Sequence, residues 1–409
     1  THCISSAASD VYKRQTLALT DVTLALLNRF GGGHRFALRA TPPRALGQPL
    51  DVRARFRHRF GARPSDIARW KGELYADLRD ADLVAWKRHI DLPGLPFQMS
   101  SGRGSVRAWL NGDQARLAGF TADLALADVN ARLGAELAPL ELARLSGRLA
   151  AREEMLPGTD EGKPTFGAHG HSVSLTGFSV TPRGGQALPP ATLEQTWRPA
   201  REGRPEQGEL RARQLDVGAL AALAGYLPLP PQQRQMLLDY APRGRLLDVA
   251  AEWEGRYPAL RSYRLRGDVA GLAIKAQPAR AGRPATPGFQ NLDGSIDASQ
   301  DGGSITVDST ALALHMPAWF ADPAVPLDRL GLKARWKLDP GKQLLVEVEH
   351  LDFAQGALSG SLSGRHSLPL LPDGGRAGPG TADITATLDG FEIGSGGRYL
   401  PPGLSLIHI

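Results

Sequence analysis

Cysteine is almost absent from this chain of 409 residues: it occurs only as Cys3, in an N-terminal peptide unlike the rest of the sequence. A body without cysteine fits a compartment where stray thiols are a liability, and it equally fits the cytoplasm. Long apolar runs are also missing. The longest, VGALAALAGYLPLP from Val217 to Pro230, contains proline and is too short to span a bilayer.

Motifs of catalysis and cofactor binding are lacking as well. There is no G-x-S-x-G elbow, no phosphate-binding loop and no complete dinucleotide-binding fingerprint. The nearest approach to a metal site is His169-Gly-His171, but no third ligand lies near it in sequence, so a solvated loop is the favoured interpretation. We therefore predict a protein that is not an enzyme, with no catalytic residue, metal or cofactor. A hydrolase that uses these two histidines is our third-ranked hypothesis.

Lysine is scarce, with 8 lysines beside 40 arginines, and the formal net charge is +6. This bias is typical of a GC-rich genome and by itself selects no partner. The segment PLDVRARFRHRF places four arginines on one strand face: Arg53, Arg55, Arg57 and Arg59. They could bind phosphate groups, but no cluster of aromatic residues accompanies them to stack on bases. A solvated face is favoured, and we predict no nucleic-acid partner.

Glycine and proline are abundant, with 47 and 31 residues, and favour many short strands and turns. Between Ala241 and Gly364 the apolar residues recur at every second position, which is typical of strands with one oily and one wet face. Turn signals such as DGG at residues 301–303 separate these runs, as in an antiparallel meander. The residues that we expect to line an apolar groove are Leu265, Val269, Ile296, Ile305, Val307, Leu330, Leu332 and Trp336.

Similar alternation predicts further strands in the N-terminal half. A hairpin is expected with its turn at Asn111-Gly112, the strongest short turn signal in the chain. A short helix is expected after Asp80 or Asp82, and two helices between Asp216 and Tyr240. Because helices able to cover the apolar faces are so few, the sheet must fold on itself, pair with a second sheet, or leave a groove open.

Glycine also recurs within the expected strands, in a pattern of the form apolar-x-Gly-x-apolar. The copies begin at Trp70, Leu145, Leu265, Leu292 and Leu358, with partial copies at Gly104 and Gly208. A glycine in mid-strand permits a bend, a bulge or the close approach of another group. On the apolar face, such glycines would let a wide sheet curl into a trough.

The two ends differ from the body and resemble translated sequencing-adapter read-through. We expect residues 1–15 and 404–409 to be non-native tails, and residues 16–403 to be one elongated β-groove segment. A sub-boundary could lie near residues 152–168, and the helices form an insert at 216–240. The chain has no initiator methionine, so we expect an internal fragment of a longer protein.

Several phrases resemble the large AsmA-like proteins of Gram-negative bacteria, specifically the YhdP type. They are PGFQNLDGSIDASQDGGSITVDS, LALHMPAWFADPAVPLDRLGLKARW, WKGELYADLRDADLVAWK, SGRGSVRAWL and GRYLP. The resemblance covers roughly residues 16–403. It implies a bridge-like periplasmic β-structure whose hydrophobic groove carries phospholipid acyl chains toward the outer membrane. It also implies an inner-membrane anchor that this fragment lacks.

Two structures could satisfy the alternating strands. The first is a mainly β, twisted antiparallel sheet of about 16 strands, curled into a hydrophobic groove with a few short helices. The second is a closed β-sandwich that serves as a structural or adhesive module and buries the same residues against a second sheet.

Deletion of both terminal peptides, residues 1–15 and 404–409, should leave the melting transition almost unchanged, because we expect neither to pack. Thermal unfolding of the truncated and complete chains measures this. A decrease of several degrees would contradict the prediction.

Overall fold

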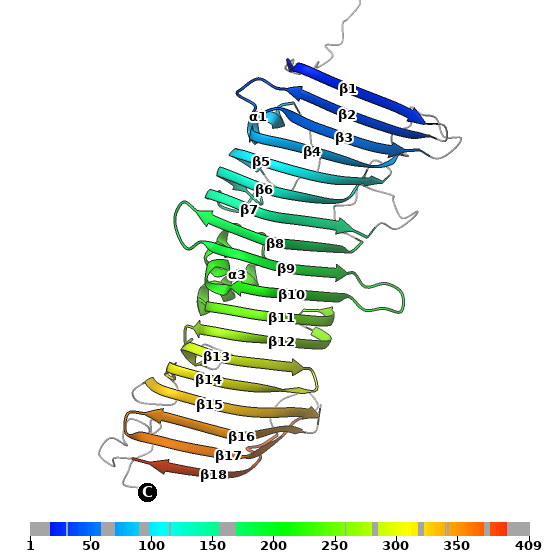
Figure 1. Ribbon diagram of the computed structural model, residues 1–409. Helices are drawn as coiled ribbons and strands as arrows, with labels where there is room; N and C mark the ends of the chain where they lie inside the picture. The colour runs from blue at the N-terminus through cyan, green and yellow to red at the C-terminus, as the bar shows by residue number, and fades with distance from the viewer. Residues whose placement is uncertain are drawn as a thin grey trace, which may run out of the picture. The chain divides into compact units, whose positions relative to one another are not determined.

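The computed structural model describes residues 17–29, 32–58, 70–89, 98–113, 116–154, 169–257, 259–279, 285–317, 323–339, 341, 343–371 and 377–390. The expected tails lie outside these ranges, as do residues 155–168 of the expected sub-boundary. The chain divides into two compact units, Thr1–Ser146 and Gly147–Ile409. We call them unit 1 and unit 2 (Figure 1).

Unit 1 is a meander of antiparallel strands. Its described strands are β1 (Thr20–Arg29), β2 (Gly33–Thr41), β3 (Leu50–Arg57), β4 (Lys71–Asp82), β5 (Gln98–Asp113) and β6 (Arg116–Arg132). Each pairs with the next one in sequence. Helix α1 (Leu83–Lys87) follows β4, and the division between the units falls inside β7 (Leu140–Glu153).

Unit 2 repeats this arrangement with more strands. They are β8 (His171–Pro182), β9 (Leu188–Arg198), β10 (Gln207–Asp216), β11 (Arg243–Arg256), β12 (Ala259–Ile274), β13 (Gly288–Ser299), β14 (Gly302–His315), β15 (Ala324–Asp339), β16 (Gln343–Gln355), β17 (Leu358–Pro369) and β18 (Thr381–Asp389). Neighbours in sequence again pair antiparallel. Between β10 and β11 lie α2 (Val217–Leu223), the short 3₁₀ helix η2 (Ala224–Tyr226) and α3 (Pro231–Tyr240).

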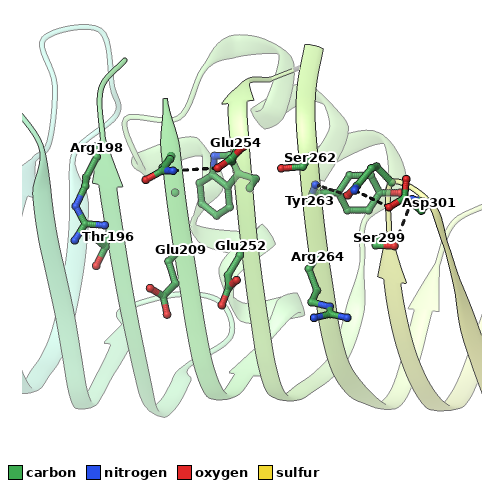
Figure 2. A pocket seen from close by; sticks show the side chains of 14 residues that line it. Thr196, Arg198, Glu209, Glu252, Glu254, Ser262, Tyr263, Arg264, Ser299 and Asp301 are labelled. Carbon is green, nitrogen blue, oxygen red and sulfur yellow. Dashed lines mark hydrogen bonds between the residues drawn. The ribbon is translucent and has the colours of Figure 1, made fainter. Parts of the chain in front are cut away.

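The predicted fold class is confirmed: the protein is mainly β, antiparallel and open, with few short helices. Within the described part of each unit, the first strand does not pair with the last, and no second sheet packs on the strands. A closed sandwich is therefore not favoured. The strands around β10–β12 bend strongly along their length (Figure 2).

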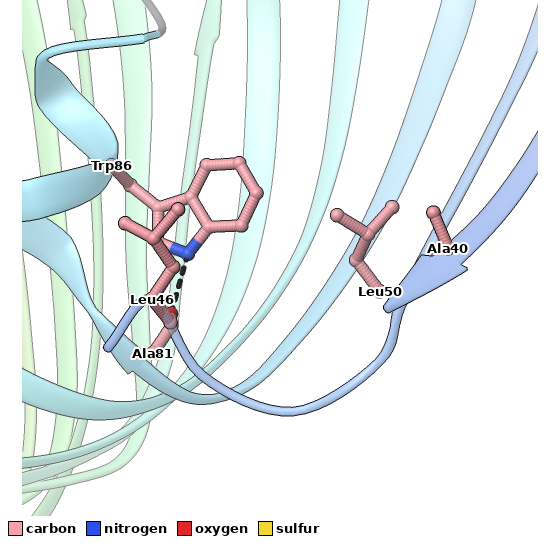
Figure 3. Packing of buried hydrophobic residues seen from close by; sticks show 5 residues of the cluster. All are labelled: Ala40, Leu46, Leu50, Ala81 and Trp86. Carbon is pink, nitrogen blue, oxygen red and sulfur yellow. Dashed lines mark hydrogen bonds between the residues drawn. The ribbon is translucent and has the colours of Figure 1, made fainter. Parts of the chain in front are cut away.

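The expected helices are present at their expected places. Asp82 caps α1 by accepting hydrogen bonds from the amides of Val84 and Ala85, at 3.1 and 2.9 Å. The side chain of Trp86 then packs on Leu46 and neighbouring apolar residues, and its indole Nε1 donates to the carbonyl of Leu46 at 2.8 Å (Figure 3). Asp80, the other capping candidate, instead forms an ion pair with Arg103.

The hairpin predicted at Asn111-Gly112 is misplaced. Both residues belong to β5, where Asn111 pairs with Gly119 and Gly112 with Leu117. The ladder continues to the pair of Asp113 and Arg116, so the connection lies beyond Asp113. The sequence signal failed because a primed turn needs positive φ at both central residues, and neither residue has it.

β-Bulges interrupt the ladders at neighbouring positions of β12, β13 and β14. Asn291 and Ala311 have left-handed φ values of 60° and 50° at one such irregularity. The fully buried Ser309 repairs the broken ladder: its hydroxyl accepts from the Asp293 amide at 2.9 Å and donates to the Asp293 carbonyl at 3.2 Å. One hydroxyl thus satisfies two backbone groups that the bulge leaves unpaired.

Replacing Ser309 with Ala should lower the free energy of unfolding by about 1–3 kcal/mol, because a buried amide and carbonyl lose their partner. Urea denaturation measures the change. Ser304→Ala, on an exposed position of the same strand, is the matched control and should have little effect. Equal losses in the two variants would contradict the assigned role.

Candidate functional site

The strands of unit 2 keep their apolar residues in phase. Ile296 of β13 lies opposite Ile305 of β14, and Ile305 lies opposite Ala334 of β15. One step along, Val307 lies opposite Leu332. Because side chains alternate between faces, this register gathers the apolar residues on one side, which we call the apolar face of unit 2.

All eight predicted groove residues lie on this face. In β12 and β13, Leu265 pairs with Ala298, and Val269 with Gly294. In β14 and β15, Ser309 pairs with Leu330, and Gly303 with Trp336. Their predicted role in contacting lipid stays a prediction.

The apolar face extends across strands that sequence reasoning did not assign. Val173 and Leu175 of β8 lie opposite Gln195 and Leu193 of β9. Leu193 in turn lies opposite Ala212 of β10. The alternation in HSVSLTGFSV, at residues 171–180, was the signal that could have revealed β8.

Most side chains of the apolar face are half-buried rather than enclosed. Ile305, Leu332 and Trp336 are all of this intermediate class. Val307 and Leu312 of β14 differ, since they are only 4% and 1% exposed. No described helix or second sheet makes extensive contact with β12–β17, so the half-buried side chains of this face keep part of their surface accessible.

Unit 1 has an apolar face of its own, built in the same way. Leu38 of β2 lies opposite Val52 of β3, and Val52 opposite Ala76 of β4. Helix α1 covers part of it through Trp86. On β1 the same face is most exposed, with Leu24 and Leu26 at 62% and 66%.

Aromatic rings lie across four of the strand glycines. The register pairs are Phe56 with Gly72, Gly208 with Trp253, Gly303 with Trp336, and Phe353 with Gly360. A Cβ added to Gly303 or Gly360 would come within 2.6 Å of the partner ring, and one at Gly72 or Gly208 would overlap it. Each ring thus extends over its glycine, in the space of the missing side chain.

Helix α2 covers the apolar face at β9–β11. The carboxylate of Asp216 caps it by accepting from the Ala219 amide at 2.8 Å. Leu220 packs on the cluster of Ala191, Ala212 and Leu215. The two helices predicted between Asp216 and Tyr240 are present, and the first of them, α2, lies on the apolar side. No helix in the described residues is long and apolar enough to cross a membrane.

The opposite face carries charged side chains in cross-strand pairs. Arg335 donates to Glu347 at 2.9 and 3.0 Å, and Arg365 approaches the same carboxylate at 3.3 Å. The hydrogen bonds from Arg335 hold the pKa of Glu347 below its ordinary value. In β3, the hydrogen bond from Arg53 similarly lowers the pKa of Asp51. At least Arg53 of the arginine stripe is therefore partly neutralised.

A cavity of about 500 Å³ is lined by residues of β9–β12 and of the β13–β14 turn (Figure 2). Its polar side chains include Thr196, Glu209, Glu252 and Arg264, which follow one another in register across β9–β12. Most of its lining is therefore polar and suited to water, although the aromatic side chains of Trp253 and Tyr263 also line it.

The two histidines do not form a ligand cluster in the described residues. His171 starts β8, contacts the ring of Trp197 and shares a 3.2 Å hydrogen bond with Gln195. The carbonyl of His169 accepts from Arg201 at 2.9 Å. No group of three potential metal ligands occurs in the part of the chain that the structure describes.

Comparison with known proteins identifies one relationship. The family model described as YhdP protein matches residues 6–405, which is nearly the whole chain. The comparisons with curated proteins and with solved structures found no match.

The Glu347 ion pairs should make stability depend on pH. A carboxyl whose pKa is lower in the folded state stabilises the fold above its unfolded pKa, and this contribution is lost as pH falls through the folded pKa. Glu347→Gln should therefore lower the melting temperature at about pH 7 and have little effect at about pH 3. Glu194→Gln, at an exposed position of β9, is the control. A loss that is equal at both pH values would refute the assignment.

Proposed function

The chain belongs to the YhdP protein family, and from this premise we propose that it is a non-enzymatic, periplasmic segment that conducts phospholipid between the inner and outer membranes. The acyl chains would lie on the apolar face while the headgroup stays in water. In this proposal the full-length protein is anchored to the inner membrane. No nucleic acid, metal or cofactor takes part.

The observation that carries the proposal is the in-phase apolar face of unit 2, most of whose side chains are half-buried. A sheet with one oily face must cover it with another layer or with a ligand. Among the described helices of unit 2, α2 is the one that packs on this face, over β9–β11. A closed sandwich would cover this face with a second apolar sheet, and the described residues contain none. The structural or adhesive module is therefore the weaker alternative.

Such a face could lower a large free-energy barrier, that of moving a lipid through water. Moving a two-chain lipid through water exposes about 30 methylenes at ~0.8 kcal/mol each, or ~24 kcal/mol in total. A barrier of that size permits about one event in many hours. A continuous apolar surface removes most of this cost without chemistry, so no catalytic group is needed.

The proposal predicts that a charge on the apolar face blocks lipid. Leu332→Asp should sharply reduce labelling of phospholipid by a photocrosslinking residue at Ile305, while the fold is largely retained, because the half-buried position leaves the carboxylate some water. Val307→Asp is a poorer test because that side chain is only 4% exposed, so unfolding would confuse the result.

Thr306→Asp supplies the matched control, since Thr306 is exposed on the polar face opposite Lys333. It should leave labelling unchanged, and a crosslinker at Thr306 itself should capture no lipid. Thermal unfolding of each variant separates a blocked surface from a lost fold. A parent protein that never labels lipid from Ile305 or Trp336 would sink the proposal.

A further inference from the structure

Helix α2 is seated closely on the sheet. Ala219 of α2 is completely buried, as is Ala224 at the start of η2, and small side chains of this kind let a helix approach the strands. Gln186 donates to the capping carboxylate of Asp216 at 3.2 Å, which ties the start of the helix to the β8–β9 connection. Leu220 completes the contact with the apolar face. The helix therefore covers the end of β10 around Ala212 and Leu215.

The uncovered part of the apolar face is correspondingly narrow at β10. From Ala212, where the helix contact ends, to Gly208 near the start of the strand is about 13 Å at ~3.3 Å per residue. In β14 no described helix lies on this face, whose positions run from Gly303 to Leu314, about 36 Å on the same basis, although Val307, Ser309 and Leu312 among them are buried. The part of the face that no described helix covers thus narrows to a strip beside α2.

Trp253 lines the end of this strip that is farther from α2, where it pairs with Gly208. Its indole lies over Gly208, so a Cβ on Gly208 would overlap the ring. Leu210, which pairs with Ala251, lies between this indole and the helix contact. A side chain at residue 208 would therefore push the indole of Trp253 away from the sheet and into the strip.

We propose that this strip, bounded by α2 and floored by Leu210 and Trp253, is the constriction through which the acyl chains of a phospholipid pass. Trp253 is a positioning residue there, because the orientation of its ring sets the free height above the sheet. The proposal rests on the proposed function. It adds that the apolar face is not uniformly wide and that passage is limited at β10–β11.

Gly208→Ala tests the proposal by lifting the indole into the strip. Photocrosslinking residues at Val173 in β8 and Ile296 in β13 report lipid on either side of it, in the intact protein in cells. The ratio of lipid labelling at the two probes should change several-fold, because lipid accumulates on the supply side and is depleted beyond the constriction. Leu210→Trp, which adds bulk without touching Gly208, should change the ratio in the same direction.

The matched control is Gly360→Ala, which displaces the ring of Phe353 in β16 where no described helix faces the sheet. It should leave the ratio near the parental value. Adding Trp253→Ala to Gly208→Ala should restore the parental ratio, which a general weakening of the strand would not.

The outcomes separate the two proposals. If the parent labels no lipid at either probe, the proposed function fails. If the parent labels at both probes but the ratio in Gly208→Ala and Leu210→Trp stays parental, or Gly360→Ala changes it equally, the constriction is overturned while the proposed function stands.

Discussion

Cross-strand register is the constraint on which the rest of the structure depends. Side chains alternate between the two faces with a period of two. A shift of one residue in the register of any strand would therefore move its apolar side chains to the polar face, toward water. The bulge at Ala311 shows how the phase survives an irregularity. Thr310 and Ala311 are both exposed, and Leu312 returns to the apolar side, where it is only 1% exposed. The bulge therefore bends the strand without breaking the continuity of the face.

Much of this could be predicted because it is local. Alternation placed Ile305 and Leu332 on one face, and capping chemistry placed the helices after Asp82 and Asp216. The Asn111-Gly112 turn failed because the ladder between β5 and β6 outweighs a dipeptide preference. The sequence pattern also could not predict how deeply each individual residue is buried. Val307 and Ile305 have the same pattern in sequence, yet only Val307 is enclosed.

The pairs of a glycine with an aromatic ring could be predicted only in part. The sequence indicates that mid-strand glycines permit close approach of another group, but not which group approaches. Gly208 meets Trp253 only because the register of β10 and β11 places them opposite each other across the helical insert. The same geometry places each of these rings over a glycine, in the space that a side chain would otherwise take. A ring in this position stabilises the sheet.

The strands of each unit contact chiefly the strands that precede and follow them in sequence. Such a structure has low contact order, so each new hairpin can form on the edge left by the previous one without waiting for a distant segment. Its stability is then close to a sum over neighbouring pairs, as in solenoid proteins. Lengthening by one hairpin would disturb only the pair at its insertion point. Evolution could therefore lengthen or shorten such a sheet by whole hairpins without redesigning a core.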